Sequence, residues 1–244
     1  MRDRIQEFLD RKGLKEKPPK LVCLVYNGHG MQHGGTVYLL PEGANPTRQN
    51  SSGRNLCKPD KEFVALSDVF DACYEFDCHA RRLEGRQDVT FVVIVDACRE
   101  FGQKSMASSL DPESSKAPVK WALCFSCSRN SVAMDGRAGE HSPFAQGLLD
   151  RETGIFAQGV PLKTALEEAC RRLGSIAGAS GQKPLALSLD AIDPDFCISP
   201  APNSQSKAQP QAGINDGVAT DSDCNELVRF LKGKGLSAIA ARFS

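Results

Sequence analysis

Short apolar runs recur along the chain, and each is bounded by polar or turn-forming residues. Three of them contain β-branched or aromatic residues, which is typical of strands that are buried on both faces, and a fourth, leucine-rich run also predicts a strand. These predicted strands cover residues 21–26, 89–95, 121–125 and 185–189. The run VTFVVIV at 89–95 is the strongest strand signal of the four.

Apolar residues in the segments around these strands recur at spacings of three and four, which predicts amphipathic helices. The predicted helices cover residues 5–9, 67–83, 142–149 and 161–173. Apolar strands that alternate with amphipathic helices predict an α/β fold, with a mostly parallel sheet and helices on both faces. Sites in such sheets form beyond the carboxyl ends of the strands.

The composition changes near residue 200. Residues 200–222 are rich in Pro, Ser, Gln, Ala, Asn and Asp, and we predict a flexible linker there. Residues 223–244 return to apolar positions at helical spacing, which predicts an amphipathic helical segment. The alternative is the start of a truncated interaction domain, whose opening helix this segment resembles. The main domain is therefore expected to span residues 1–199.

Charge and cysteine usage narrow the functional classes. Lysine plus arginine equals aspartate plus glutamate at 30 each, so net charge gives no argument for a nucleic-acid or membrane partner. Residues 1–20 lack the apolar stretch of a secretory signal. Of the ten cysteines, Cys23 and Cys124 lie inside apolar runs, where cysteine is typically a small buried hydrophobe. We expect free thiols and a cytoplasmic location.

One histidine and one cysteine directly follow predicted strands. His29 comes just after the 21–26 run and Cys98 just after the 89–95 run, so two strands can bring them together across 69 positions. A cysteine nucleophile reacts as the thiolate and needs a proton acceptor, and histidine is the usual one. The backbone N–H groups of Gly30 and Cys98 are the expected oxyanion donors.

The residues around both positions resemble those of caspase-like cysteine peptidases. YNGHG at 26–30 is similar to the His-Gly motif of caspases, metacaspases and paracaspases, and DACRE at 96–100 is similar to their cysteine motif. SPF at 142–144 and GQKP at 181–184 resemble later family elements. An aspartate two positions before the cysteine favours the metacaspase and paracaspase branch. The resemblance covers roughly residues 1–198.

The resemblance implies a caspase-like three-layer sandwich and a cysteine endopeptidase with His29 and Cys98 as its catalytic pair. It also implies that Asp96 lines the primary specificity pocket and selects arginine or lysine before the scissile bond. The alternative for Asp96 is a turn cap or an ion pair with Arg99. Ser126 lies where the family builds substrate contacts.

Further expectations concern activation and partners. Lys104 and Lys116 lie in the loop after the nucleophile, where relatives are often cut, so they are candidate autocleavage sites; ordinary solvated lysines are the alternative. Protein or peptide substrates are expected, and relatives often dimerise through an edge strand, which makes a homodimer a candidate assembly. Residues 31–40 contain no carboxylate, so the sequence does not support calcium activation, and no metal or cofactor is expected.

Two further hypotheses concern other residue clusters. His141 is a rival for the catalytic base, although it follows a polar turn and no buried strand. Zinc ligation by the cysteines and the histidine near residues 73–79, or by the pair at 124 and 127, lacks the two paired ligand sets of a typical zinc site.

Two hypotheses compete with an active peptidase. Only 20 residues precede the 21–26 run, so the family's first strand is expected to be absent, which favours a pseudo-peptidase that serves as an interaction module. The other alternative is a redox protein that senses oxidants through Cys98.

Overall fold

The structure is a computed structural model that describes most of the chain up to residue 201 and one segment near its end. The described residues are 2–33, 35–41, 43–46, 49, 52, 57–83, 88–97, 117–128, 133–134, 141–177, 182–201 and 236–241.

The centre of the fold is a five-stranded sheet with the order β7-β6-β5-β1-β8. Three neighbouring strands run parallel, namely β1 (Leu21–Asn27), β5 (Thr90–Asp96) and β6 (Lys120–Phe125). The two edge strands, β7 (Leu185–Leu187) and β8 (Leu236–Ala241), run antiparallel to their neighbours. The mostly parallel sheet confirms the fold class predicted from the apolar runs.

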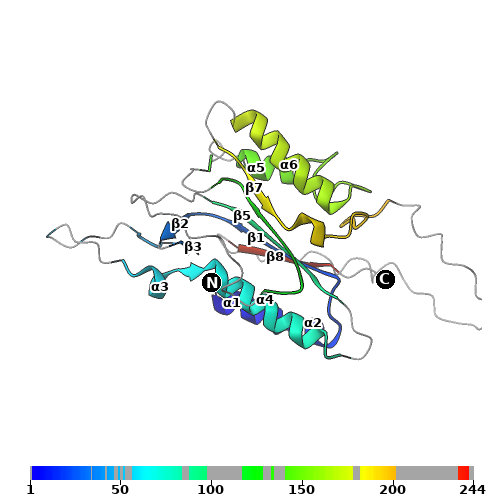
Figure 1. The fold of residues 1–244 in the computed structure, drawn as a ribbon, viewed down its shortest axis with the longest axis horizontal. Coiled ribbons are helices and arrows are strands. Elements are labelled where there is room, and N and C mark those ends of the chain that lie inside the picture. Colours follow the sequence, from blue (N-terminus) through cyan, green and yellow to red (C-terminus); the bar gives the residue numbers. More distant parts are fainter. Residues whose placement is uncertain are drawn as a thin grey trace, which may run out of the picture.

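Helices cover both faces of this sheet (Figure 1). One face carries α1 (Arg2–Leu9), α2 (Lys12–Glu16) and α4 (Leu66–Ala80), and the other carries α5 (Pro143–Leu148) and α6 (Leu162–Ala177). The resulting helix–sheet–helix arrangement is the predicted three-layer sandwich. No helix among the described residues is both long enough and apolar enough to cross a bilayer.

The continuous apolar run of β1 is explained by burial on both sides. Successive side chains of a strand point to opposite faces. Val22, Leu24 and Tyr26 lie in the core that includes α1 and α4, whereas Leu21 and Cys23 lie in the core that includes α5 and α6. Each of these side chains is at most 1% exposed, so neither face of the strand requires polar residues.

A smaller antiparallel sheet follows β1 and was not among the predicted elements. It consists of β2 (Gly30–His33), β3 (Thr36–Leu39) and β4 (Val64–Ala65), and a short helix, α3 (Pro59–Glu62), precedes its last strand. Its strands are only two to four residues long, which is too short for a clear alternating pattern.

The last predicted strand of the main domain is shorter than expected. It ends at Leu187, because Ser188 adopts a left-handed backbone conformation with φ of 55°. A 3₁₀ turn, η2 (Leu189–Ala191), follows it.

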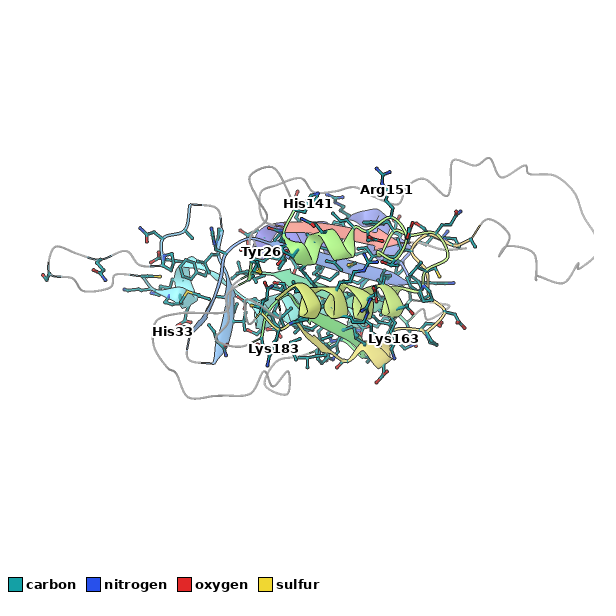
Figure 2. The ribbon with its side chains drawn as sticks, turned by 90° about the horizontal axis from the view of Figure 1, so that it is seen from above. Tyr26, His33, His141, Arg151, Lys163 and Lys183 are labelled. Carbon is teal, nitrogen blue, oxygen red and sulfur yellow. The ribbon has the colours of Figure 1, made fainter. Side chains whose placement is uncertain are left out.

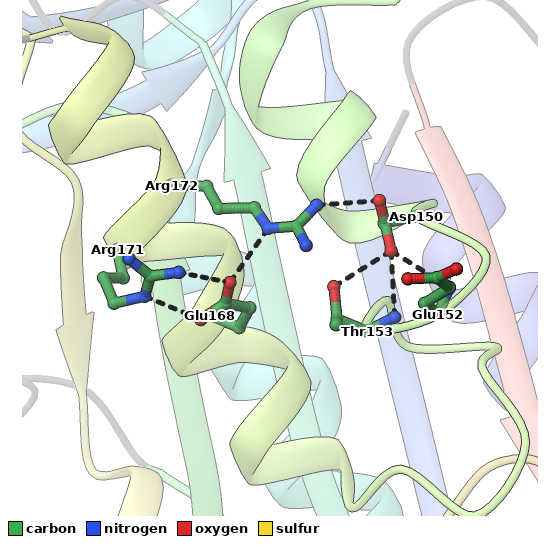
Figure 3. A network of polar contacts seen from close by, with 6 residues as sticks. All are labelled: Asp150, Glu152, Thr153, Glu168, Arg171 and Arg172. Carbon is green, nitrogen blue, oxygen red and sulfur yellow. Dashed lines mark hydrogen bonds and ion pairs between the residues drawn. The ribbon is translucent and has the colours of Figure 1, made fainter.

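The loop after α5 is tied to α6 by the polar network of Figure 3. Arg172 donates from Nη1 to Asp150 Oδ2 at 2.7 Å and from Nε to Glu168 Oε1 at 2.9 Å. Asp150 also accepts hydrogen bonds from the backbone N–H and the hydroxyl of Thr153. Hydrogen bonds from Arg171 and Arg172 lower the pKa of Glu168 to about 2. The network therefore stays ionised at neutral pH and links two segments of the outer layer.

The prediction of a helical segment over residues 223–244 is wrong for residues 236–241. These six residues form β8, which pairs with β1 from Tyr26↔Leu236 to Leu21↔Ala241. The other residues of that segment and the predicted linker lie outside the described residues, apart from 200–201. Leucine, isoleucine and alanine at 236, 239 and 240 fit a helix or a strand, and the unpaired edge of β1 decides between the two.

Residues 2–20 contain the two helices α1 and α2, and no strand precedes β1 in this described range. The sheet position next to β1 is instead held by β8.

We predict that deleting residues 235–244 destabilises the domain and promotes self-association, because the backbone groups at the edge of β1 lose their partners. The midpoint of thermal unfolding should fall by roughly 5 °C, and size-exclusion chromatography should show larger species. An internal deletion of residues 206–215 removes ten residues but retains β8, and it should leave both properties unchanged. Equal midpoints for the full chain and the truncated chain would show that β8 contributes nothing.

Candidate active site

The site lies where two neighbouring parallel strands end. Asn27, the last residue of β1, pairs in register with Asp96, the last residue of β5. His29 follows two residues after the first strand end, and Cys98 occupies the corresponding place after the second. Cys98 itself lies outside the described residues. β1 and β5 are therefore neighbouring parallel strands, as two strands that bring these positions together must be, and the assignment of His29 and Cys98 as a catalytic pair stays a prediction.

The backbone of His29 is held from two sides while its side chain is exposed to solvent. Its carbonyl oxygen accepts a hydrogen bond from Leu40 N at 2.9 Å and another from Tyr26 Oη at 2.6 Å. Tyr26 Oη also lies 2.8 Å from the carbonyl oxygen of Leu40. A phenol has one proton, so the two carbonyls share it. Tyr26 thus joins the histidine loop to the end of β3.

Burial keeps this tyrosine protonated. Tyr26 is 1% exposed, and desolvation raises its pKa to about 12, opposed in part by the hydrogen bond with Leu40. Its hydroxyl is therefore a donor across the physiological pH range, and the anchoring of the His29 carbonyl does not depend on pH there.

Gly28 is needed because the tyrosine hydroxyl packs directly against it. A Cβ atom at this position would lie 2.7 Å from Tyr26 Oη and 3.0 Å from Cζ, and contacts this short do not occur without displacement of the ring. The N–H of Gly28 donates to the carbonyl oxygen of Asp96 at 3.2 Å. This bond continues the pairing of the two strands by one residue toward the histidine.

The N–H of Gly30 is oriented away from the neighbouring strand. Gly30 pairs with Leu39, and the bond from Leu40 N to the His29 carbonyl lies beside this pair. That pattern identifies a non-hydrogen-bonded pair of an antiparallel ladder, in which the N–H groups point outward. The position of Gly30 is therefore compatible with a donor to an oxyanion.

The carboxyl group of Asp96 is buried at the strand end. The residue is 6% exposed, and its Oδ2 accepts hydrogen bonds from Ser142 Oγ and, at 3.4 Å, from Asn27 Nδ2. Asp96 is thus buried where β5 ends, beside the end of β1. Its role in a specificity pocket stays a prediction.

The segment after β6 is anchored through its backbone. Ser126 N donates to the carbonyl oxygen of Val95 at 3.0 Å, and Ser126 O accepts from Gln182 Nε2 at 2.8 Å. Gln182 Oε1 in turn accepts from Met134 N at 2.8 Å. The side chain of Ser126 is fully buried, and among the described residues its hydroxyl has no hydrogen-bond partner. Because the backbone groups of Ser126 also have partners, the substrate contact by Ser126 stays a prediction.

A second cysteine fixes the residue that precedes Cys98. Cys127 is fully buried, and its Sγ donates to the carbonyl oxygen of Ala97 at 3.2 Å. The sequence does not predict this contact or the contacts of Tyr26 and Gln182. Tyr26 belongs to the YNGHG motif and Gln182 to the GQKP motif, but no local pattern reveals their partners.

Three of the other thiols are poor nucleophiles because they are buried. Desolvation raises the pKa of Cys23 to about 12, and it also raises the pKa of Cys73. A hydrogen bond with Cys170, together with burial, raises the pKa of Cys124. These groups are protonated at neutral pH, whereas a nucleophile reacts as the thiolate. Among the described residues, no group of three or more histidine, cysteine or acidic side chains could hold a metal ion.

The remaining candidates lie on separate elements. His33 is at the exposed end of the β2–β3 hairpin, and His141 is an exposed residue beside α5 (Figure 2). The carbonyl oxygen of His141 accepts from Gln146 Nε2 at 2.8 Å. Lys104 and Lys116 lie outside the described residues.

We predict that Tyr26→Phe impairs catalysis as well as stability, because it removes the shared hydroxyl that anchors the His29 carbonyl. The free energy of unfolding should fall by about 1–3 kcal/mol, and kcat/KM should fall severalfold. Tyr38→Phe is a matched control, since Tyr38 is also buried but its hydroxyl donates to Asp60. The control should lose stability and keep its activity. An equal loss of activity in both variants would contradict a specific role for Tyr26.

Comparison with protein families identifies the fold. A family model described as the caspase domain matches residues 1–189, well over half of the 244 residues, whereas no curated protein matched the chain. The matched range includes both strand ends, the Gly28 turn and Asp96. The three-layer α/β architecture agrees with this match. The chain therefore belongs to the caspase domain family of cysteine peptidases.

Proposed function

We propose that this caspase-family chain is an active endopeptidase of the metacaspase and paracaspase type, and that it cleaves peptide bonds after arginine or lysine. One observation carries the proposal: Asn27 and Asp96 pair in register at the carboxyl ends of neighbouring parallel strands. Two catalytic loops that start from one such edge lie within reach of one substrate.

In the proposed mechanism, His29 accepts the thiol proton of Cys98, and the sulfur attacks the carbonyl carbon of the scissile bond. The N–H groups of Gly30 and Cys98 stabilise the oxyanion. His29 then returns the proton to the leaving amine, which departs and leaves a thioester. Water, deprotonated by His29, hydrolyses the thioester and regenerates the thiol. The anchored carbonyl of His29 and the outward N–H of Gly30 support these assignments.

The proposed specificity depends on Asp96. A carboxylate in a site with little water attracts a guanidinium or ammonium group more strongly than an exposed one does. The burial of Asp96 at the strand end supports this role, and the contacts with Ser142 and Asn27 hold its carboxyl group there. An arginine side chain could bind the carboxylate with two parallel hydrogen bonds, and a lysine with one.

The same proposal includes activation and assembly. Autocleavage after Lys104 or Lys116 would follow from a preference for basic residues. The outer edge of β7 is the candidate surface for a homodimer, since one side of this strand pairs with β6 and β7 ends the order of the described strands. We propose a cytoplasmic enzyme that needs neither calcium nor another cofactor.

The central prediction concerns matched fluorogenic peptides that end in arginine, lysine or aspartate. Wild-type protein should hydrolyse the two basic peptides, while Cys98→Ala and His29→Ala should each reduce turnover by a factor of about 10³ or more. Addition of a calcium chelator should not change the rate.

Three other outcomes would each contradict part of this proposal. Preference for the aspartate peptide would leave a peptidase but contradict the pocket role of Asp96. A folded wild-type protein that cuts none of the peptides would contradict the proposal and favour an interaction module without catalysis. Persistent turnover in Cys98→Ala would contradict the nucleophile assignment.

We predict that Asp96→Asn removes the preference for basic peptides without unfolding the domain, because asparagine keeps the shape of the side chain but not its charge. The value of kcat/KM for arginine and lysine peptides should fall by roughly 10²-fold, mainly through KM. Thermal unfolding of the variant establishes that it is folded. Unchanged KM values in a folded variant would place the specificity pocket elsewhere.

A further inference from the structure

Ser142 connects the proposed pocket acid to the outer helical layer. Its hydroxyl oxygen accepts a hydrogen bond from Ala145 N at 3.0 Å, which caps the N-terminus of α5. The same hydroxyl donates its single proton to Asp96 Oδ2. One side chain thus has two partners, and both its donor and its acceptor capacity are used.

The helix that carries Ser142 is firmly packed. Phe144 and Leu148 of α5 are 1% and 4% exposed and lie in the core with α6. A Cβ atom at Gly147 would lie 3.3 Å from the Cα atom of Ala169, so the backbones of α5 and α6 approach closely. The position of the Ser142 hydroxyl is therefore set by the packing of the α5–α6 layer.

Ser142 makes a closer contact with Asp96 than the second donor does. Asn27 Nδ2 lies 3.4 Å from Asp96 Oδ2, near the upper limit for a hydrogen bond, and it belongs to the adjacent strand. Ser142 comes from a different layer of the fold and approaches the same oxygen. A carboxylate held by two layers has a defined rotation about its side-chain bonds.

We propose that Ser142 is a specificity-positioning residue that orients the carboxylate of Asp96 for arginine. The inference rests on the proposed function, in which Asp96 binds the basic side chain before the scissile bond. A guanidinium forms two parallel bonds with a carboxylate only when their planes align, whereas an ammonium group acts as a point charge with little directional demand. Loss of the Ser142 hydroxyl should consequently impair cleavage after arginine more than cleavage after lysine.

The test compares arginine and lysine peptides in Ser142→Gly and Ser142→Thr. Glycine caps a helix nearly as well as serine but has no hydroxyl, and threonine keeps both functions. Ser142→Gly should lower the ratio of kcat/KM for arginine to that for lysine by roughly tenfold, mainly through the KM for arginine. Ser142→Thr should show the same ratio as the wild-type protein. In the Asp96→Asn background, Ser142→Gly should have no further effect on the ratio.

The controls separate this role from simple support of the helix. Gln146→Ala removes the contact of Gln146 with the His141 carbonyl in the same turn of α5, and it should not change the ratio. If Ser142→Gly does not fold, Ser142→Cys keeps the side-chain shape with a weaker donor and should give a lowered ratio.

The outcomes distinguish the positioning role from the proposed function. Cleavage of basic peptides with an unchanged ratio in folded Ser142→Gly or Ser142→Cys would overturn the positioning role alone. A wild-type protein that cleaves no basic peptide would overturn the proposed function and this inference with it. If Gln146→Ala and Ser142→Gly lower kcat/KM equally for both peptides, the effect comes from a general change in the helix, and the positioning role is overturned.

Discussion

The parallel pairing of β1 with β5 is the constraint on which the site depends. It brings Asn27 and Asp96 to the same edge of the sheet, although 69 positions separate them in the sequence. A slip of one residue would turn every side chain of β1 to the opposite face. Tyr26 would then leave the core where its hydroxyl reaches the His29 carbonyl. The register of two buried strands thus determines where the segments that carry His29 and Cys98 begin.

Polar contacts at this edge hold the functional groups in place relative to the two strands. Tyr26 and Gly28 hold the backbone around His29, and Ser142 connects Asp96 to α5. Tyr26 also reaches the Leu40 carbonyl beside the smaller sheet, Gly28 joins the ends of two neighbouring strands, and Ser142 joins the helical layer to the central sheet. In a buried setting, a missing partner leaves a polar group unsatisfied, which costs about 1–3 kcal/mol. The cost favours one arrangement of the loops over alternatives.

The sheet edge beside β1 illustrates how tertiary context overrides local periodicity. The residues of β8 have helical spacing and moderate helix propensity, and the sequence alone favours a helix there. An unpaired strand edge offers a row of N–H and C=O groups, and a segment that pairs with them satisfies its own backbone as well. The hairpin of β2 and β3 was missed for a related reason, since its short strands are stabilised by a local cluster that contains Met31 and Tyr38.

The fold class and the two motifs that follow the parallel strands can be predicted from the amino-acid sequence alone. Burial on both faces requires apolar runs, and a nucleophilic cysteine with a histidine base is a recognisable chemical pair. The pairing of β8 with β1 and the contact of Ser142 with Asp96 depend instead on the folded arrangement of the chain. These contacts join residues that are far apart in the chain, and no periodicity or spacing encodes which distant backbone edge or carboxylate a segment will meet.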